Sequence, residues 1–434
     1  MKLKRVIPLA GLAAAGVAHA ESITVATVNN NDMVIMQSLT EAFESAHPDI
    51  EIDWVVLEEN VLRQRLTTDI ATDGGQFDVL TIGTYEAPIW AERGWLVPLD
   101  DLPDDYAVDD LLKPVRDGLS HDGTLYALPF YAESSMMFYR TDLFEEAGIE
   151  MSDQPTWQEV REWAGAIHDP ENGVAGICLR GKPGWGENMA FLSTLVNTFG
   201  GRWFDEEWNP QLDSPAWQEA VQFYVDLMND YGPAGASSNG FNENLAMFSR
   251  GKCGMWVDAT SAAGKLFNPD ESEVADELGF APAPIAETPK GAHWLWSWAL
   301  AIPSSSDSPE AAQTFIAWAT GQDYIELVGE SEGWTSVPPG TRESTYENEH
   351  YQREAPFAGF VLEAINSADP TDSTLEPTPY QGVQFVGIPE FQSIGTQVGQ
   401  TIAAALTGET SVEQALASAQ RATERTMQRA GYLD

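Results

Sequence analysis

The sequence predicts an α/β protein of two lobes, each of which is a sheet flanked by helices. The chain has 434 residues, which is more than one hydrophobic core usually supports. From residue 23 onward, segments with the period of a strand alternate with segments that have the period of a helix. Residues 23–82 follow the order β-α-β-α-β, which predicts a parallel sheet with right-handed crossovers.

The first sheet is expected to contain strands at residues 23–28, 50–56 and 77–82. A helix that Asp32 caps, and that ends at His47-Pro48, joins the first two strands. A helix over residues 61–70 precedes the third strand. Ligands of such sheets bind beyond the carboxyl ends of the strands, which are here residues 29–31 and 83–86.

A second unit of strands and helices begins after Phe130. Thr156 and Glu159 are spaced as a capping box, in which each side chain accepts a hydrogen bond from a backbone N–H at the start of a helix. Further strands are expected over residues 174–179, 254–257 and 293–302. Further helices are expected from Ser214-Pro215, from Ser308-Pro309 and on both sides of Gly408, the last of them capped by Ser411.

The first twenty residues have the pattern of a secretory signal peptide. A basic start (Lys2, Lys4, Arg5) precedes an apolar stretch and the cleavage pattern Ala18-His19-Ala20. No cysteine follows this site, so a lipid anchor is not expected, and no later run approaches the ~18 apolar residues that span a bilayer. The mature chain is expected to be soluble and periplasmic.

The chain is strongly acidic throughout. Its formal net charge is −45, and removal of residues 1–20 would make it more negative. Acidic residues are spread along the sequence, which indicates a uniformly acidic surface suited to a salty exterior; an ordinary acidic exported protein is the alternative. Nucleic acids and anionic membranes are excluded as partners, because both need clustered cations.

Patterns of catalysis and cofactor binding are missing. The histidines lack the spacing of a zinc site, and no Gly-x-Ser-x-Gly or phosphate-binding loop occurs. The pair of carboxylates that a glycosidase needs cannot be recognised here, because among 67 acidic residues some pair is inevitable. We therefore expect no catalytic residue, metal or cofactor. Cys178 and Cys253 could form one disulfide or remain two buried thiols.

Several segments together resemble one family. They are residues 125–148 (LYALPFYAESSMMFYRTDLFEEAG), 251–258 (GKCGMWVD), 298–303 (WALAIP) and 406–415 (LTGETSVEQA). These resemble the extracytoplasmic solute-binding proteins of ABC importers, and more narrowly their maltose-binding-protein-like sugar and polyol group. The resemblance covers essentially all of residues 21–434. Residues 27–40 (TVNNNDMVIMQSLT) resemble the mannitol and sorbitol branch of that group.

The resemblance implies a two-lobed periplasmic-binding-protein fold with a ligand cleft between the lobes and several hinge crossings. The N-terminal lobe would comprise residues 21–129 and 299–342, and the C-terminal lobe residues 130–298 and 343–434. Such a monomeric protein would capture a sugar alcohol of the mannitol or sorbitol kind, or a related small sugar, by hinge closure and deliver it to a membrane permease. A secreted carbohydrate-active enzyme or a lectin is the alternative.

Candidate ligand contacts follow from the chemistry of hydroxyl-rich ligands. Flat aromatic faces cover their C–H groups, and amide, carboxylate or guanidinium groups meet neighbouring hydroxyls in pairs. For Asn30 and Asn31 the alternative is a turn and helix cap, and for Trp296 it is packing in the core. Of Trp256 and Asp258, one should face the cleft, and Asp258 is preferred. The expected contacts are Asn30, Asn31, Tyr85, Tyr131, Glu133, Arg180, Trp185, Asn188, Trp256, Asp258 and Trp296.

Overall fold

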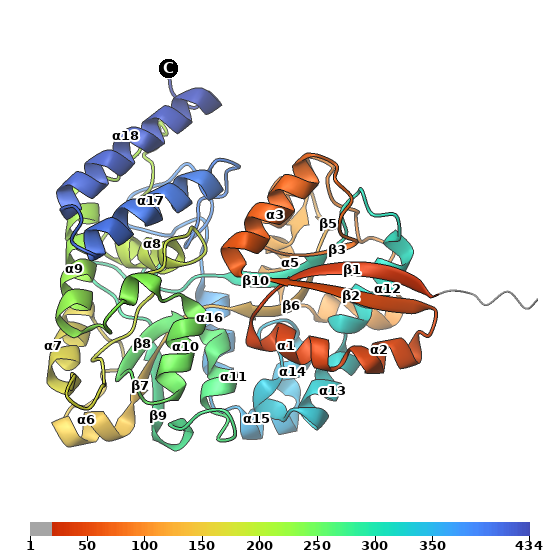
Figure 1. Cartoon of the computed structure of the whole chain (residues 1–434), viewed down its shortest axis with the longest axis horizontal. Coiled ribbons are helices and arrows are strands. Elements are labelled where there is room, and N and C mark those ends of the chain that lie inside the picture. Colours follow the sequence, from red (N-terminus) through yellow and green to blue (C-terminus); the bar gives the residue numbers. More distant parts are fainter. Residues whose placement is uncertain (1–19) are drawn as a thin grey trace, which may run out of the picture.

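The computed structural model describes residues 20–434, so the expected signal peptide lies almost entirely outside the described residues. Two lobes lie side by side, each with its own sheet (Figure 1). The α/β class predicted from the sequence is confirmed. Within the described residues, no helix is long and apolar enough to cross a membrane.

The first lobe contains a five-stranded sheet in the order β2-β1-β3-β10-β6. Its strands are β1 (Glu21–Val28), β2 (Ile50–Leu57), β3 (Val79–Gly83), β6 (Leu128–Glu133) and β10 (Trp296–Ala301). The strands β1, β2 and β3 are parallel, as the β-α-β-α-β pattern predicts. The strand β10 is antiparallel to both of its neighbours, β3 and β6.

The second lobe contains an antiparallel sheet in the order β8-β7-β9. Its strands are β7 (Ser135–Arg140), β8 (Met255–Ala259) and β9 (Leu278–Pro282), and a small ribbon of β4 (Ser120–His121) and β5 (Thr124–Leu125) lies apart from both sheets. The chain passes from β6 to β7 through Ser134 alone. Residues 130–133 and 296–298, which the sequence assigned to the C-terminal lobe, therefore pair with the strands of the first sheet.

Helices cover both sheets (Figure 1). The helices up to residue 167 are α1 (Asn31–Ser38), α2 (Thr40–Ala46), α3 (Glu59–Ala71), α4 (Glu86–Glu92), α5 (Lys113–Gly118), α6 (Thr141–Ala147) and α7 (Trp157–Ile167). The later helices are α8 (Asn188–Thr198), α9 (Pro215–Tyr231), α10 (Phe241–Ser249), α11 (Ala263–Leu266), α12 (Pro309–Ala319), α13 (Gln322–Ser331), α14 (Glu343–Glu347), α15 (Glu349–Glu354), α16 (Ala358–Ser367), α17 (Phe391–Leu406) and α18 (Val412–Ala430). The C-terminal pair α17 and α18 packs on α8 and α9 of the second lobe.

Two of the predicted helix starts, at Thr156 and Ser411, are confirmed by their capping hydrogen bonds. Thr156 and Glu159 form both bonds of the capping box, and Ser411 accepts a hydrogen bond from the backbone N–H of Gln414. The prediction that Asp32 caps the first helix is wrong, because Asn30 accepts the hydrogen bond from the backbone N–H of Met33 and so caps α1. Ser214 precedes α9, but its side chain makes no capping hydrogen bond.

The segment expected as a strand over residues 174–179 is not a regular strand. It meets β8 and the turn before it at isolated parallel bridges, Ala175 with Cys253 and Cys178 with Trp256. A disulfide joins Cys178 to Cys253, which resolves the alternative that the sequence left open. Both cysteines are buried, so the bond fixes the segment to the edge of the second sheet.

Candidate functional site

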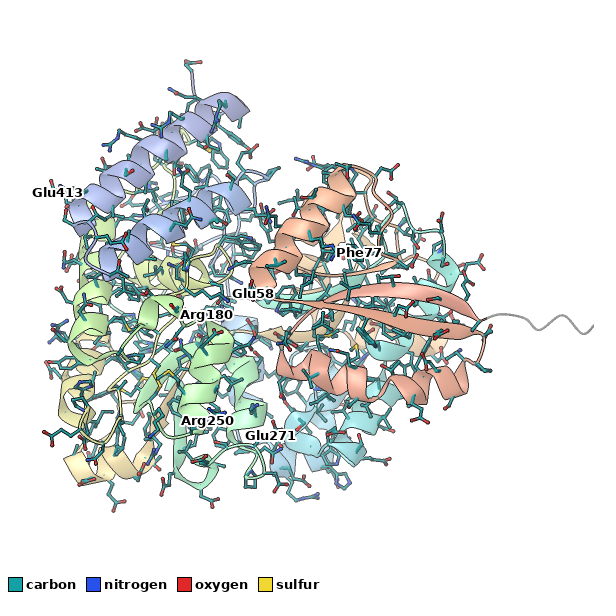
Figure 2. All side chains as sticks on the ribbon, in the orientation of Figure 1. Glu58, Phe77, Arg180, Arg250, Glu271 and Glu413 are labelled. Atoms are coloured by element: carbon teal, nitrogen blue, oxygen red, sulfur yellow. A yellow bond between two sulfur atoms is a disulfide. The ribbon has the colours of Figure 1, made fainter. Side chains whose placement is uncertain are left out.

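A cavity of about 410 Å³ lies between the two lobes. Figure 2 shows Glu58 and Arg180, two of its lining residues, on facing sides of the boundary between the lobes. We call the residues that the first lobe contributes the first wall and those that the second lobe contributes the second wall. The lining of the first wall includes Asn29, Asn30, Glu58, Glu59, Arg63, Tyr131, Glu133, Trp296 and Trp298. The lining of the second wall includes Arg180, Lys182, Trp185, Glu187, Phe241, Asn242 and Glu243.

The first wall is built at the carboxyl ends of strands. Asn30 follows β1, and its amide Nδ2 donates to the hydroxyl of Tyr131 on β6 over 3.1 Å. Glu58 and Glu59 follow β2, and Glu58 caps α3 by accepting a hydrogen bond from Val61. Strand ends of a parallel sheet meet at one edge, so residues from distant parts of the sequence come to lie around one cavity.

Arg63 is the central cation of the first wall. Its Nη1 lies 2.7 Å from Glu86 and its Nη2 lies 3.0 Å from Glu59. The guanidinium carbon also lies 4.1 Å from the ring centroid of Trp185, 4.5 Å from that of Trp298 and 4.9 Å from that of Trp296. Such contacts with indole faces are attractive. Arg63 is therefore held between carboxylates and aromatic rings.

Glu86 anchors Arg63 through an ion pair. It is buried at the start of α4, where its second carboxylate oxygen accepts a hydrogen bond from the backbone N–H of Gly83. Although Glu86 begins a helix, its side chain is therefore not a solvated one.

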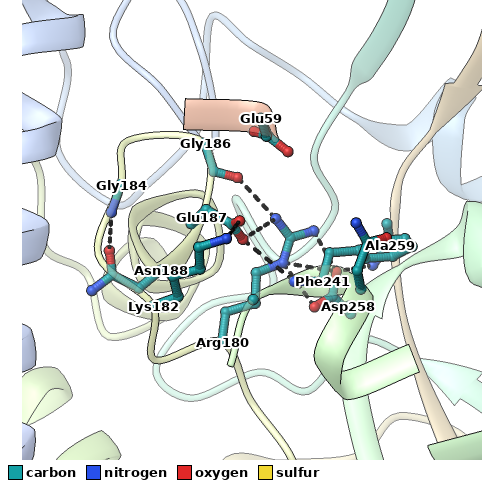
Figure 3. A network of polar contacts seen from close by, with 12 residues as sticks. Glu59, Arg180, Lys182, Gly184, Gly186, Glu187, Asn188, Phe241, Asp258 and Ala259 are labelled. Carbon is teal, nitrogen blue, oxygen red and sulfur yellow. Dashed lines mark hydrogen bonds and ion pairs between the residues drawn. The ribbon is translucent and has the colours of Figure 1, made fainter. Parts of the chain in front are cut away.

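Most of the second wall is a loop, residues 180–187, which a buried ion pair holds in place (Figure 3). Arg180 donates from Nε and Nη2 to both oxygens of Asp258, at 2.9 Å and 2.6 Å, and from Nη1 to the carbonyl of Gly186 at 2.8 Å. Asp258 also accepts a hydrogen bond from the indole of Trp256. Burial alone acts to lower the pKa of Arg180, but Asp258 outweighs it and raises this pKa.

Two carboxyl groups of the cavity are unusually weak acids. Burial raises the pKa of Glu133 to about 8, although Ser261 donates a hydrogen bond of 2.6 Å to its side chain. Burial and the nearby Glu59 raise the pKa of Glu187 to about 7. Near neutral pH, Glu133 is therefore largely protonated and can donate a hydrogen bond as well as accept one.

The two walls touch each other at the edge of the cavity. Lys182 lies 2.6 Å from Glu58 across the boundary and 3.3 Å from Glu187 on its own side. Asn242 donates a hydrogen bond of 2.8 Å to the carbonyl of Asn29. Burial acts to lower the pKa of Lys182, but the two carboxylates outweigh it and raise this pKa. These contacts hold the lobes together in the arrangement described.

Six of the expected contacts line the cavity: Asn30, Tyr131, Glu133, Arg180, Trp185 and Trp296. The other five do not line it. Asn31 begins α1 and lies in a small neighbouring crevice, and Tyr85 faces a second cavity. Asn188 instead bonds to Gly184 and Gly399 within the second lobe. Trp256 and Asp258 are fully buried beneath Arg180, which they support.

Several lining residues were not expected from the sequence. Glu58, Glu59 and Arg63 follow the carboxyl end of β2, so the rule that selected Asn30 could have found them. Trp298 also lines the cavity, although it was not among the contacts expected from the sequence. Phe241, Asn242 and Glu243 begin α10, far along the chain, and no local pattern distinguishes them from any other helix start. Among residues 20–434, no group of His, Cys, Asp and Glu side chains is arranged to hold a metal ion.

Comparisons with known proteins agree with this architecture. Residues 28–326 match the family described as bacterial extracellular solute-binding protein. The mannitol-binding protein of Pseudomonas aeruginosa is 60% identical over 413 residues, which are 95% of this chain and 94% of that protein. An ABC transporter solute-binding protein of Agrobacterium vitis, solved with bound D-mannitol, is 61% identical with a TM-score of 0.94, over 95% of this chain and 99% of that chain.

A more distant solved structure shares the fold. It is an ABC transporter solute-binding protein of Agrobacterium radiobacter in complex with ribitol, which is 22% identical with a TM-score of 0.83 and covers 94% of this chain and 99% of that chain. These relatives are solute-binding proteins, so the comparisons do not support the alternative of an enzyme or lectin. The chain belongs to the bacterial extracellular solute-binding protein family, and its fold is the two-lobed fold that the sequence predicted.

Proposed function

We propose that this protein captures D-mannitol, or a closely related hexitol, in the cavity between its lobes and delivers it to the permease of an ABC importer. The observation that carries the proposal is the lining of this cavity, which combines indole faces with paired acidic and basic groups. The likeness to the Agrobacterium vitis protein with bound D-mannitol supports the choice of hexitol.

The walls suit a neutral ligand with many hydroxyl groups. Trp296 and Trp298 offer flat faces on one side, and Trp185 offers one on the other. Glu133 and Glu187 offer carboxyl groups, and Asn30 and Arg180 offer groups that can donate. Within residues 20–434, the buried indole N–H groups of Trp185 and Trp294, both in the lining, have no hydrogen-bond partner. Buried N–H groups are normally paired, so ligand hydroxyls are suitable acceptors for them.

Capture is proposed to occur by closure of the lobes about their crossings. One crossing is the direct passage from β6 to β7 through Ser134, and another lies between β9 and β10. A ligand that contacts both walls stabilises the closed arrangement over the open one, because only the closed arrangement provides all contacts. The permease would then recognise the closed form.

A screen of thermal stability tests the ligand class. Hexitols, pentitols, monosaccharides, disaccharides and amino acids are each added to the purified mature protein, and the melting temperature is measured. Binding to the native state raises stability by mass action, so mannitol is expected to give the largest rise and sorbitol a comparable one. A rise with oligosaccharides only would overturn the hexitol assignment, and a rise with amino acids only would overturn sugar and polyol binding.

We also propose that the chain is exported to the periplasm after cleavage behind Ala20 and acts as a monomer.

We further propose that the protein is adapted to salt. Its net charge of −45 creates repulsion that extends over a Debye length of ~30 Å in dilute buffer and ~3 Å near 1 M salt. The melting temperature is therefore expected to rise markedly from low to molar NaCl, and equally in KCl. A flat or falling melting temperature would refute salt adaptation and leave ligand binding untouched.

A further inference from the structure

We propose that an aromatic partition, formed by Trp185, Trp296, Tyr85 and Phe385 and clamped by Arg63, limits the ligand to a single six-carbon unit. The inference rests on the proposed hexitol binding and adds what sets the size of the ligand. Without the partition, the cleft would extend into a second cavity that could hold a sugar residue attached to the hexitol.

The partition consists of two pairs of rings, and each pair has one ring that lines the first cavity and one that lines the second. Trp185 lines the first cavity, and its ring lies 4.7 Å from that of Tyr85, which lines the second. Trp296 also lines the first cavity, and its ring lies 6.1 Å from that of Phe385, which lines the second. Trp185 and Trp296 contact each other at 5.9 Å, and Tyr85 and Phe385 at 5.6 Å. The four rings therefore form one continuous layer.

The cavity behind this layer is large. It has a volume of about 480 Å³, against about 410 Å³ for the first cavity. Gln384 lines both cavities, so they are direct neighbours. Its amide donates to the carbonyl of Leu295 over 2.9 Å, which holds the side chain beside the partition. Both volumes are within the range of small-molecule sites, ≈300–1,000 Å³.

The partition is fixed from several sides. Arg63 lies over the rings of both Trp185 and Trp296, and it is anchored to Glu86. The hydroxyl of Tyr85 donates to the carbonyl of Ile388 at 2.9 Å. A Cβ at Gly83 would lie 2.1 Å from Trp296, so only glycine at the end of β3 lets this indole lie across the sheet. Because Trp185 and Tyr85 come from opposite lobes, the partition is complete only when the lobes are closed.

Maltitol, which is sorbitol with one attached glucose, tests the partition directly. Dissociation constants for mannitol, sorbitol and maltitol are measured by calorimetry for the wild type and for Trp185→Ala, Trp185→Phe and Trp208→Ala. Trp208 lines the second cavity but is not part of the partition, so Trp208→Ala is the matched control. The wild type is expected to bind both hexitols and to bind maltitol at least 100-fold more weakly than sorbitol.

In Trp185→Ala the preference for sorbitol over maltitol is expected to fall at least tenfold. In Trp185→Phe this preference should fall by less, and in Trp208→Ala it should be unchanged. A wild type that binds maltitol as well as sorbitol, or a preference unchanged in Trp185→Ala, overturns the partition and leaves hexitol binding intact. If Trp185→Ala binds neither sorbitol nor maltitol, Trp185→Phe decides the outcome. An unchanged preference of Trp185→Phe for sorbitol overturns the partition, whereas a reduced preference supports it. A wild type that binds no polyol refutes the proposed function itself.

Discussion

The two walls of the cavity are built by different means. The first wall is carried by the ends of hydrogen-bonded strands and by α3, which begins directly after β2. The second wall is carried largely by the irregular loop 180–187, which depends on the buried pair of Arg180 and Asp258 and on the disulfide behind it. A strand ladder distributes support over many backbone hydrogen bonds, whereas a loop relies on few side chains. The second wall should therefore be the more vulnerable to single substitutions.

The largest effect is expected from Asp258→Asn. It leaves the buried charge of Arg180 with only Glu187, which is 3.9 Å away and whose own pKa is raised to about 7. Loss of one member of a buried pair costs about 3–5 kcal/mol. The free energy of unfolding, measured by urea denaturation without ligand, should fall by this amount. The matched control is Glu86→Gln in the first wall, where Arg63 retains Glu59. Equal losses in the two variants would contradict the difference between the walls.

Removal of the disulfide should have the next largest effect. Cys178 and Cys253 are 75 residues apart in the sequence, and a disulfide that closes a loop stabilises a protein by typically 2–4 kcal/mol. The double variant Cys178→Ala, Cys253→Ala should lose about this much stability in the same urea experiment. Affinity for mannitol should fall as well, because Arg180 directly follows the tethered segment. Unchanged affinity together with lowered stability would show that the tether does not position the second wall.

An effect that is smaller per pH unit is expected from Glu133→Gln, which changes the first wall. The pKa of Glu133 is raised from 4.5 to about 8 in the native state. Between these values the native state binds a proton that the unfolded chain releases, so the free energy of unfolding falls as pH rises. One such group contributes up to about 1.4 kcal/mol per pH unit. Glu133→Gln should reduce this slope between pH 5 and pH 8.

Melting temperatures of the ligand-free wild type and variant over this pH range measure that slope. Glu413→Gln, at an exposed position of α18, is the control. If Glu133→Gln and the wild type lose stability in parallel, Glu133 does not titrate as a buried carboxyl.

The smallest effect is expected where the two walls meet. Lys182 and Glu58 are both partly exposed, and such a pair contributes about 0–1 kcal/mol. Lys182→Met should therefore weaken mannitol binding by no more than a few-fold in dilute buffer. The loss should vanish near 1 M NaCl, where the wild-type pair is screened. Lys113→Met, on the exposed surface of α5, should have no effect on binding at any salt concentration.

The sequence alone determined the α/β class, the parallel order of β1, β2 and β3, and the position of Asn30 at a strand end. These features depend on local periodicity and capping, which neighbouring residues encode directly. Tyr131, Glu133, Arg180, Trp185 and Trp296, which the sequence predicted as ligand contacts, line the cavity. Each belongs to a segment that combines aromatic or charged residues with a strand end, a crossing or a glycine-rich loop.

Only the tertiary structure decided which polar groups face the cavity and which support it from behind. Asp258 and Asn188 are polar residues near the site, yet they are satisfied by Arg180 and by backbone groups of distant segments. Tyr85 follows β3 as expected, but its hydroxyl binds the carbonyl of Ile388 across the lobes. Contacts between residues far apart in the sequence leave no local pattern, since each partner's burial depends on how the two lobes close.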